Sequence, residues 1–164
     1  MSESGPVVSN SGPLIALATV GQLDVLGSLY GSVLIPGAVF REVTEAGGGR
    51  PGALEVASAT WIERVDVDPP PDRLLAEELG AGEAEAITLA MRRGARLLLL
   101  DDRRARRIAE VAYSLRVKGV AGLLVAAKRR GLITAVRPLL EAMRVHGYYL
   151  SQRLIDRACR EAGE

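Results

Sequence analysis

The chain has 164 residues, of which 48% are hydrophobic and 25% charged, and its formal net charge is +1. This length suits one substantial hydrophobic core, and the near-zero charge excludes a protein that attracts nucleic acid through its overall charge. The only cysteine, Cys159, cannot form an internal disulfide, which fits a reducing, cytoplasmic location. The sequence shows neither a signal-peptide pattern nor an apolar run long enough to span a bilayer, so we expect no membrane contact.

Short apolar strands alternate with amphipathic helices along the chain. In chain order, the predicted elements are a strand at 7–9, a helix that has Pro13 in its first turn and its apolar face at 14–18, a helix at 23–29, a strand at 33–35, a helix at 36–43, a glycine-rich loop at 47–52, a helix at 53–58, a strand at 61–67, a proline-rich connector at 69–71, a helix at 83–93, a strand at 96–100, a helix at 103–113, a strand near 117 and a helix at 122–130. This alternation predicts an α/β fold with three layers, in which helices cover both faces of a central parallel sheet.

The last part of the chain reads differently. From about residue 133 the pattern predicts two more helices and no strand. We therefore expect residues 1–131 to form the α/β domain and residues 132–164 to be a helical extension of the same domain.

Oxygen-bearing side chains stand where two predicted strands end. Asn10 follows the first strand directly, where it or Ser11 can cap the next helix. Asp101 and Asp102 follow the strand at 96–100, the clearest in the sequence. Because ligands of open parallel sheets bind beyond the carboxyl ends of the strands, we expect these side chains to share one rim.

Two further acids lie on predicted helices. Glu83 shares a helical face with the apolar positions Ala86, Ile87 and Ala90, and Glu42 belongs to the helix that follows the second strand. Together with the strand-end residues they could form an oxygen-rich pocket for Mg²⁺ or Mn²⁺. Such an ion can polarise a phosphate and lower the pKa of an attacking water.

Simpler explanations exist for each acid. Asp101 and Asp102 could only cap the following helix, Glu83 could be an acid favoured by the helix dipole, and Glu42 could be a solvated surface residue. The convergence of these positions on one rim favours the metal pocket.

A basic run follows the acid pair. Cations in the first turn of a helix oppose its dipole, so Arg103, Arg104 and Arg107 are candidates for contacts with RNA phosphates. A solvated face balanced by the neighbouring aspartates explains them equally well. His146 is the only histidine, so no histidine-based dyad is available, and Tyr148 is interpreted as a packing residue.

Three motifs resemble those of the PIN-domain ribonucleases. Residues 7–17 (VVSNSGPLIAL) resemble the opening strand and helix, residues 82–87 (GEAEAI) the helix that carries the central acid, and residues 97–102 (LLLLDD) the strand and acid that follow it. The resemblance spans residues 7–130 and points to a prokaryotic branch related to the toxin ribonucleases of toxin–antitoxin pairs. Members of that branch also carry a segment like 119–133 and a helical tail.

The resemblance implies a PIN-like fold and a metal-dependent endonuclease acting on single-stranded RNA. By position, Glu42, Glu83 and Asp101 match the family's catalytic acids. Mg²⁺ or Mn²⁺ would be held by Glu83, Asp101, Asp102 and Asn10. The family's first acid falls on Asn10, whose amide oxygen can ligate a hard cation but brings no negative charge.

The implied partners are RNA and a small antitoxin protein, and a homo-oligomer is expected. One alternative is a PIN-fold module that binds RNA or a protein without cleaving, because Asn10 weakens the metal site. A second alternative is a receiver-type phosphoacceptor domain, since an apolar strand followed by Asp-Asp also occurs there. In receivers that pair follows the first strand, whereas here it comes late in the chain.

Overall fold

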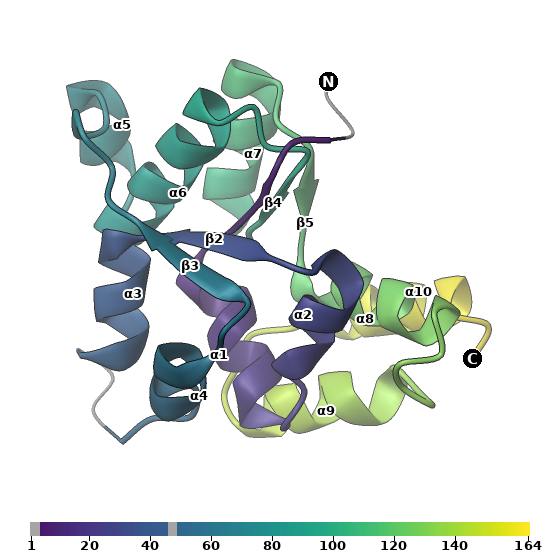
Figure 1. Ribbon diagram of the computed structural model, residues 1–164. Coiled ribbons are helices and arrows are strands. Elements are labelled where there is room, and N and C mark those ends of the chain that lie inside the picture. The colour runs from purple at the N-terminus through teal and green to yellow at the C-terminus, as the bar shows by residue number, and fades with distance from the viewer. Residues whose placement is uncertain (1–3, 46–48) are drawn as a thin grey trace.

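A parallel sheet forms the centre of the computed structural model, which describes residues 4–45 and 49–164 (Figure 1). Its strands are β1 (Val7–Ser9), β2 (Val33–Pro36), β3 (Ile62–Val65), β4 (Leu97–Leu99) and β5 (Val117–Lys118). They lie in the order β3-β2-β1-β4-β5, and every pair is parallel. The chain thus winds outward from β1 in one direction and then, at β4, in the other.

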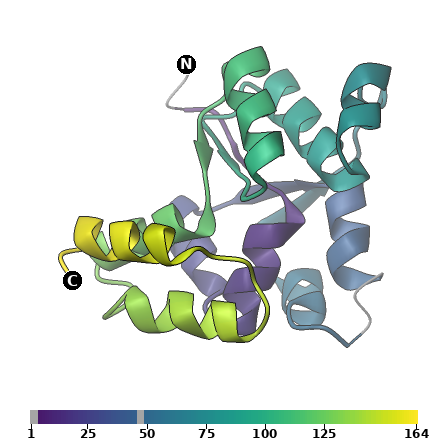
Figure 2. The same ribbon diagram turned by 180° about the vertical axis from the view of Figure 1, so that it is seen from behind.

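Helices cover both faces of this sheet. Within the described residues they are α1 (Ser11–Thr19), α2 (Asp24–Tyr30), α3 (Gly37–Thr44), α4 (Ala53–Ser58), α5 (Arg73–Glu78), α6 (Ala81–Arg92), α7 (Arg103–Tyr113), α8 (Val120–Arg129), α9 (Arg137–Val145) and α10 (Gln152–Glu161). The α5, α6 and α7 helices lie on one side, and α1, α2, α8, α9 and α10 on the other (Figures 1 and 2). This arrangement confirms the predicted three-layer α/β/α fold.

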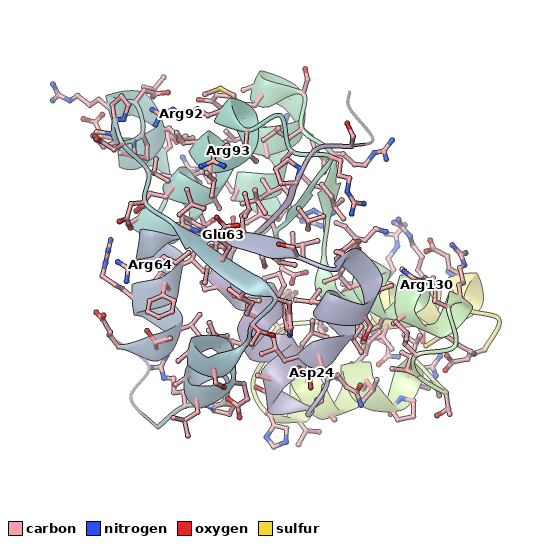
Figure 3. The ribbon with its side chains drawn as sticks, in the orientation of Figure 1. Asp24, Glu63, Arg64, Arg92, Arg93 and Arg130 are labelled. Atoms are coloured by element: carbon pink, nitrogen blue, oxygen red, sulfur yellow. The ribbon has the colours of Figure 1, made fainter. Side chains whose placement is uncertain are left out.

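Alternation along the strands builds two cores. Successive side chains of a strand point to opposite faces, so Val7 packs into the core beneath α1 and α8, whereas Val8 packs against α6 and α7. Both residues are buried, as expected for parallel strands covered on two sides. Charged side chains such as Arg64, Arg92 and Arg130 lie at the surface (Figure 3).

The helical tail shares the first of these cores. Leu140 and Met143 of α9 are fully buried in it, as are Ile155 and Cys159 of α10. The α10 helix contacts both α8 and α9 (Figure 2). The tail is therefore packed against the sheet layer and can contribute side chains to its rim.

The structure differs from the sequence expectations in a few places. It contains the α5 helix, which was not predicted; the Asp72 side chain caps it by accepting the amide of Leu75 at 2.9 Å. The strand expected at 61–67 is shorter, and Gly47 and Gly48 of the expected loop lie outside the described residues. Among the helices described, none combines the length and apolar character needed to cross a membrane.

Candidate active site

The topology brings the ends of β1 and β4 together. Ser9 is paired with Leu99, and the backbone N–H of Asn10 donates to the carbonyl oxygen of Leu99 at 2.9 Å. The segments that follow β1 and β4 therefore leave the sheet at the same edge, or rim, at the point where the strand order reverses. This switch point is where open parallel sheets bind their ligands.

Asn10 is held at this rim with an unused oxygen. The residue is 7% exposed, and its backbone is extended at the start of α1, yet its side chain makes no capping hydrogen bond. Among the described residues, the buried Oδ1 has no hydrogen-bond partner. Because a buried acceptor without a donor costs roughly 1–3 kcal/mol, the position suits an amide that meets a cation or water.

Glu42 connects three helices at the rim. Its Oε2 accepts from the Ser11 hydroxyl at 2.9 Å, and its Oε1 accepts from the backbone N–H of Gly82 at 3.0 Å. A Cβ on residue 82 would lie 2.6 Å from Oε1, so this approach requires a glycine. These bonds fix the carboxylate of α3 beside the first turn of α6.

Glu83 carries the clearest electrostatic signature of the rim. Burial raises the pKa of its carboxyl above the ordinary value, and the negative charges of Asp102 and then Glu42 raise it further. In the described part of the chain its buried Oε2 has no hydrogen-bond partner. Asp102 and Glu42 therefore both act on the Glu83 carboxylate, and a cation placed beside it would relieve both the burial and the repulsion.

Asp101 has a separate set of partners. Burial raises the pKa of its carboxyl, while a hydrogen bond from the Tyr148 hydroxyl, the backbone N–H of Val120 and the charge of Arg106 lower it in part. The Tyr148 bond to Oδ2 measures 2.6 Å and the Val120 bond to Oδ1 measures 3.0 Å. Each oxygen keeps acceptor capacity, because a carboxylate oxygen can accept more than one bond.

Tyr148 was interpreted from the sequence as a packing residue only. It does pack against the core beneath α1, but its hydroxyl also orients Asp101 from the segment between α9 and α10. No local pattern could reveal this contact, because the two residues lie far apart in the chain and meet only through tertiary packing.

Asp102 combines two roles. Its Oδ1 accepts the amide of Ala105 at 2.9 Å and so caps α7, as the simpler explanation expects. Its charge also raises the pKa of Glu83, so Asp102 acts on the carboxylate of Glu83. The residues at this edge of the sheet, Asn10, Glu42, Glu83, Asp101 and Asp102, are called the acid rim below.

The three predicted RNA-binding arginines are all exposed on α7. Arg104 forms an ion pair with Glu78 of α5, and this pair occupies its guanidinium. Arg103 and Arg107 extend from the same helix. Arg106, which was not among the candidates, interacts electrostatically with Asp101.

The donor atoms at the rim are of the type that a divalent cation prefers, but their arrangement is not yet that of a metal site. In residues 4–45 and 49–164, no group of three or more His, Cys, Asp or Glu side chains is arranged to hold a metal ion. The unpartnered oxygens of Asn10 and Glu83 and the raised pKa of Glu83 nevertheless match the preference of Mg²⁺ and Mn²⁺ for oxygen ligands. The hydrogen bonds that hold Glu42 and Asp101 would have to share their oxygens with the ion.

Comparison with known proteins agrees with this architecture. A family model described as the PIN domain matches residues 6–164, from the first strand through the helical tail. The comparison with curated proteins found no match, and neither did the comparison with solved structures. On the strength of this match, which covers nearly the whole chain, the protein belongs to the PIN-domain family and has its nuclease-like fold.

Proposed function

We propose that the protein is a divalent-metal-dependent endonuclease that cleaves single-stranded RNA. The observation that carries the proposal is the buried, unpartnered oxygen of Glu83, whose carboxyl has a pKa raised by burial and by two neighbouring acids. Such a site favours a hard cation at the rim where a PIN fold exposes its strand ends.

Each rim residue has a role in this proposal. Glu83, Asp101, Asp102 and Asn10 would hold Mg²⁺ or Mn²⁺, and Glu42 would complete the set of acids. When bound, the ion supplies polarisation of the phosphate and a lowered pKa for water.

The protein's own groups supply orientation and charge around these acids. The Tyr148 hydroxyl and the Val120 amide fix the carboxylate of Asp101. Arg103 and Arg107 are exposed and could contact the RNA backbone, whereas Arg104 would first have to leave Glu78.

A cleavage assay tests the proposal. The purified protein is incubated with labelled single-stranded RNA in Mg²⁺, in Mn²⁺ and in EDTA, beside Glu83→Gln and Asp101→Asn. We expect metal-dependent cleavage by the natural chain and its loss in both variants, with melting curves confirming that the variants fold. Cleavage that persists in both folded variants, or no cleavage across a broad RNA panel, would oppose the proposal.

A second candidate function rests on Asn10. A neutral amide in place of a carboxylate lowers the charge available to a cation, which favours a module that binds RNA or a protein without cutting. RNA binding without metal-dependent cleavage, unchanged by Asn10→Asp, would select this alternative.

The biological setting follows from the resemblance to toxin ribonucleases. We propose that a small antitoxin protein restrains the nuclease. Induced expression should then arrest growth of a bacterial host, and co-expression of a short reading frame, if one lies directly upstream of the gene, should relieve the arrest. Growth unaffected by an active enzyme would oppose the toxin role without opposing the nuclease.

A further inference from the structure

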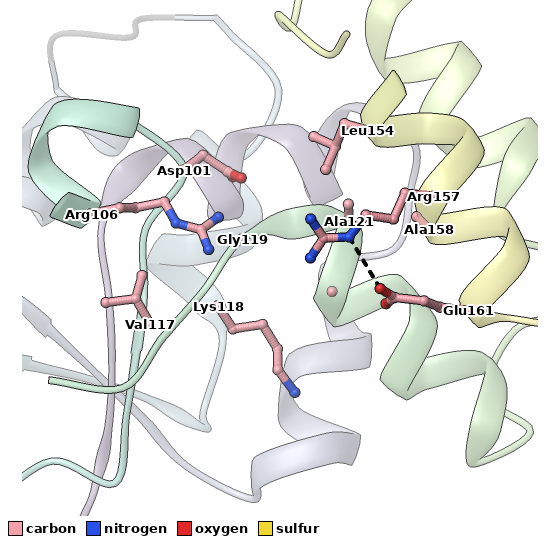
Figure 4. Close-up of a pocket in the computed structure, with 11 residues that line it drawn as sticks. Asp101, Arg106, Val117, Lys118, Gly119, Ala121, Leu154, Arg157, Ala158 and Glu161 are labelled. Atoms are coloured by element: carbon pink, nitrogen blue, oxygen red, sulfur yellow. Dashed lines mark hydrogen bonds and ion pairs between the residues drawn. The ribbon is translucent and has the colours of Figure 1, made fainter. Parts of the chain in front are cut away.

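A polar recess, separate from the acid rim, adjoins Asp101 on the side that faces the helical tail (Figure 4). It has a volume of about 140 Å³. Its floor is the β5–α8 junction, and its walls come from α7 and α10. The polar and charged residues that line it include Asp101, Arg106, Lys118, Arg157 and Glu161.

The charges of this recess are predominantly positive. Figure 4 shows the guanidinium groups of Arg106 and Arg157 pointing toward one another across it. Arg157 is paired with Glu161 at 3.2 Å, whereas Arg106 has a loose contact with Glu110 at 3.9 Å and interacts electrostatically with Asp101. Both are helical pairs of exposed or half-buried side chains, which hold their partners weakly. An anion between the two guanidiniums would therefore be favoured.

Lys118 also lines the recess, with its ammonium pointing away from the two guanidiniums (Figure 4). Within the described residues it forms no ion pair with an acid, and burial, followed by the charges of Arg116 and Arg129, lowers the pKa of its ammonium. Like charges gathered around a partly buried amine are unfavourable without an anion. The lining thus contains three cations against two acids, Asp101 and Glu161.

The size of the recess limits what can enter. A volume of 140 Å³ lies below the roughly 300–1,000 Å³ of pockets for drug-sized ligands. Gly119 keeps this space open, because a Cβ there would lie 2.4 Å from Asp101 Oδ1 and 2.8 Å from Arg106 Nη1. A group of the size of a phosphate fits in this space.

We propose that this recess binds a phosphate group of the RNA, one that neighbours the phosphate held at the acid rim. The inference rests on the proposed function, because Asp101 belongs to both the rim and the recess. The planar guanidiniums of Arg106 and Arg157 suit phosphate oxygens. The helical tail then contributes a substrate contact through Arg157, in addition to the Tyr148 bond that orients Asp101.

RNA binding in EDTA tests the recess separately from catalysis. Fluorescence anisotropy is measured with a labelled single-stranded RNA at several salt concentrations, for the natural chain and for Arg157→Gln and Lys118→Gln. We expect Arg157→Gln to bind roughly tenfold more weakly, and Lys118→Gln to bind more weakly by a smaller factor. The dependence of log affinity on log salt should become shallower by about 0.7 for each lost phosphate contact.

Arg73→Gln is the matched control. Arg73 is likewise an exposed arginine in a helical pair, with Glu77 at 2.8 Å, but it lies on α5, away from α10 (Figures 1 and 2). This variant should keep the affinity and salt dependence of the natural chain. The same RNA with and without a terminal phosphate distinguishes an end from an internal phosphate as the group that enters the recess.

The possible results separate the recess from the nuclease. RNA binding that depends on Arg157 in a protein that never cleaves supports the recess while opposing the proposed function. Metal-dependent cleavage by a chain whose Arg157→Gln and Lys118→Gln variants bind RNA like the natural protein overturns the recess alone. The absence of RNA binding by the natural chain in EDTA also overturns it, as does an equal loss in Arg73→Gln.

Discussion

Replacing Tyr148 with Phe removes one hydroxyl and tests how the tail supports the acid rim. The hydroxyl donates to Asp101 Oδ2 at 2.6 Å. Burial, followed by the charge of Asp101, raises the pKa of Tyr148, so the phenol stays protonated and remains a donor at neutral pH. Its hydrogen bond lowers the pKa of Asp101 against the effect of burial.

The expected loss follows from the charge on the acceptor. A hydrogen bond to an ionised group contributes about 1.5–3 kcal/mol, so Tyr148→Phe should lower the free energy of unfolding by about that amount at neutral pH. For a chain of this size each kcal/mol corresponds to roughly 2–4 °C in the melting temperature.

The pH dependence has a definite sign. In the metal-free protein the pKa of Asp101 is raised above its ordinary value of 3.8, so the folded state keeps this proton to a higher pH than the unfolded state. The free energy of unfolding therefore falls as the pH rises from the unfolded pKa through the folded pKa. Without the hydroxyl the folded pKa rises further, so the loss in Tyr148→Phe should grow from acidic to neutral pH.

Thermal melts in EDTA, in acidic and in neutral buffer, measure this difference. Tyr149→Phe is the control. Tyr149 is the next residue in the chain and is 90% exposed, and the chemical change is identical. Equal stability of Tyr148→Phe and the natural chain at neutral pH would refute the reasoning. An equal loss at both pH values would show that the hydroxyl does not act through the charge of Asp101.

Three other substitutions probe the rim and the tail. Asn10→Asp should bind Mn²⁺ more tightly in a calorimetric titration and cleave RNA faster, because a negative ligand favours a hard cation; equal affinity would show that position 10 does not limit binding. Asp102→Ala should lose about 1 kcal/mol in urea unfolding, because the Ala105 amide loses its cap. Glu164→Ala should lose a similar amount in thermal melts, since its side chain accepts the Val136 amide at 2.6 Å; unchanged stability in either would remove its capping role.

The fold could be predicted largely from short-range patterns. The apolar runs at 7–9, 33–35 and 97–99 are each bounded by residues that stop a strand, so their positions were visible in the sequence. The α5 helix was missed because it follows three prolines, although Asp72 had the chemistry of a helix cap. The low helix propensity of the prolines favours a connector, but the cap that Asp72 provides starts a helix directly after them.

The residues of the candidate site could be proposed from strand ends and from helix positions, but their contacts could not. Asn10 and Asp101 follow β1 and β4, and parallel pairing brings them to one rim. The contacts of Asp101 with Tyr148 and of the recess with Arg157 depend on how α9 and α10 fold back. That packing is set by buried residues of the tail, and its register cannot be read from the motifs.

Titration of Mn²⁺ into the metal-free protein is the most direct test of a metal-binding acid rim. Calorimetry on the natural chain and on Glu83→Gln compares the same pocket with and without the acid whose pKa is raised. We predict saturable binding by the natural chain, at least about tenfold weaker binding by the variant, and a melting temperature that rises with Mn²⁺ in the natural chain. Equal binding by both proteins, or no binding by the natural chain at millimolar Mn²⁺, would contradict a metal site built on Glu83.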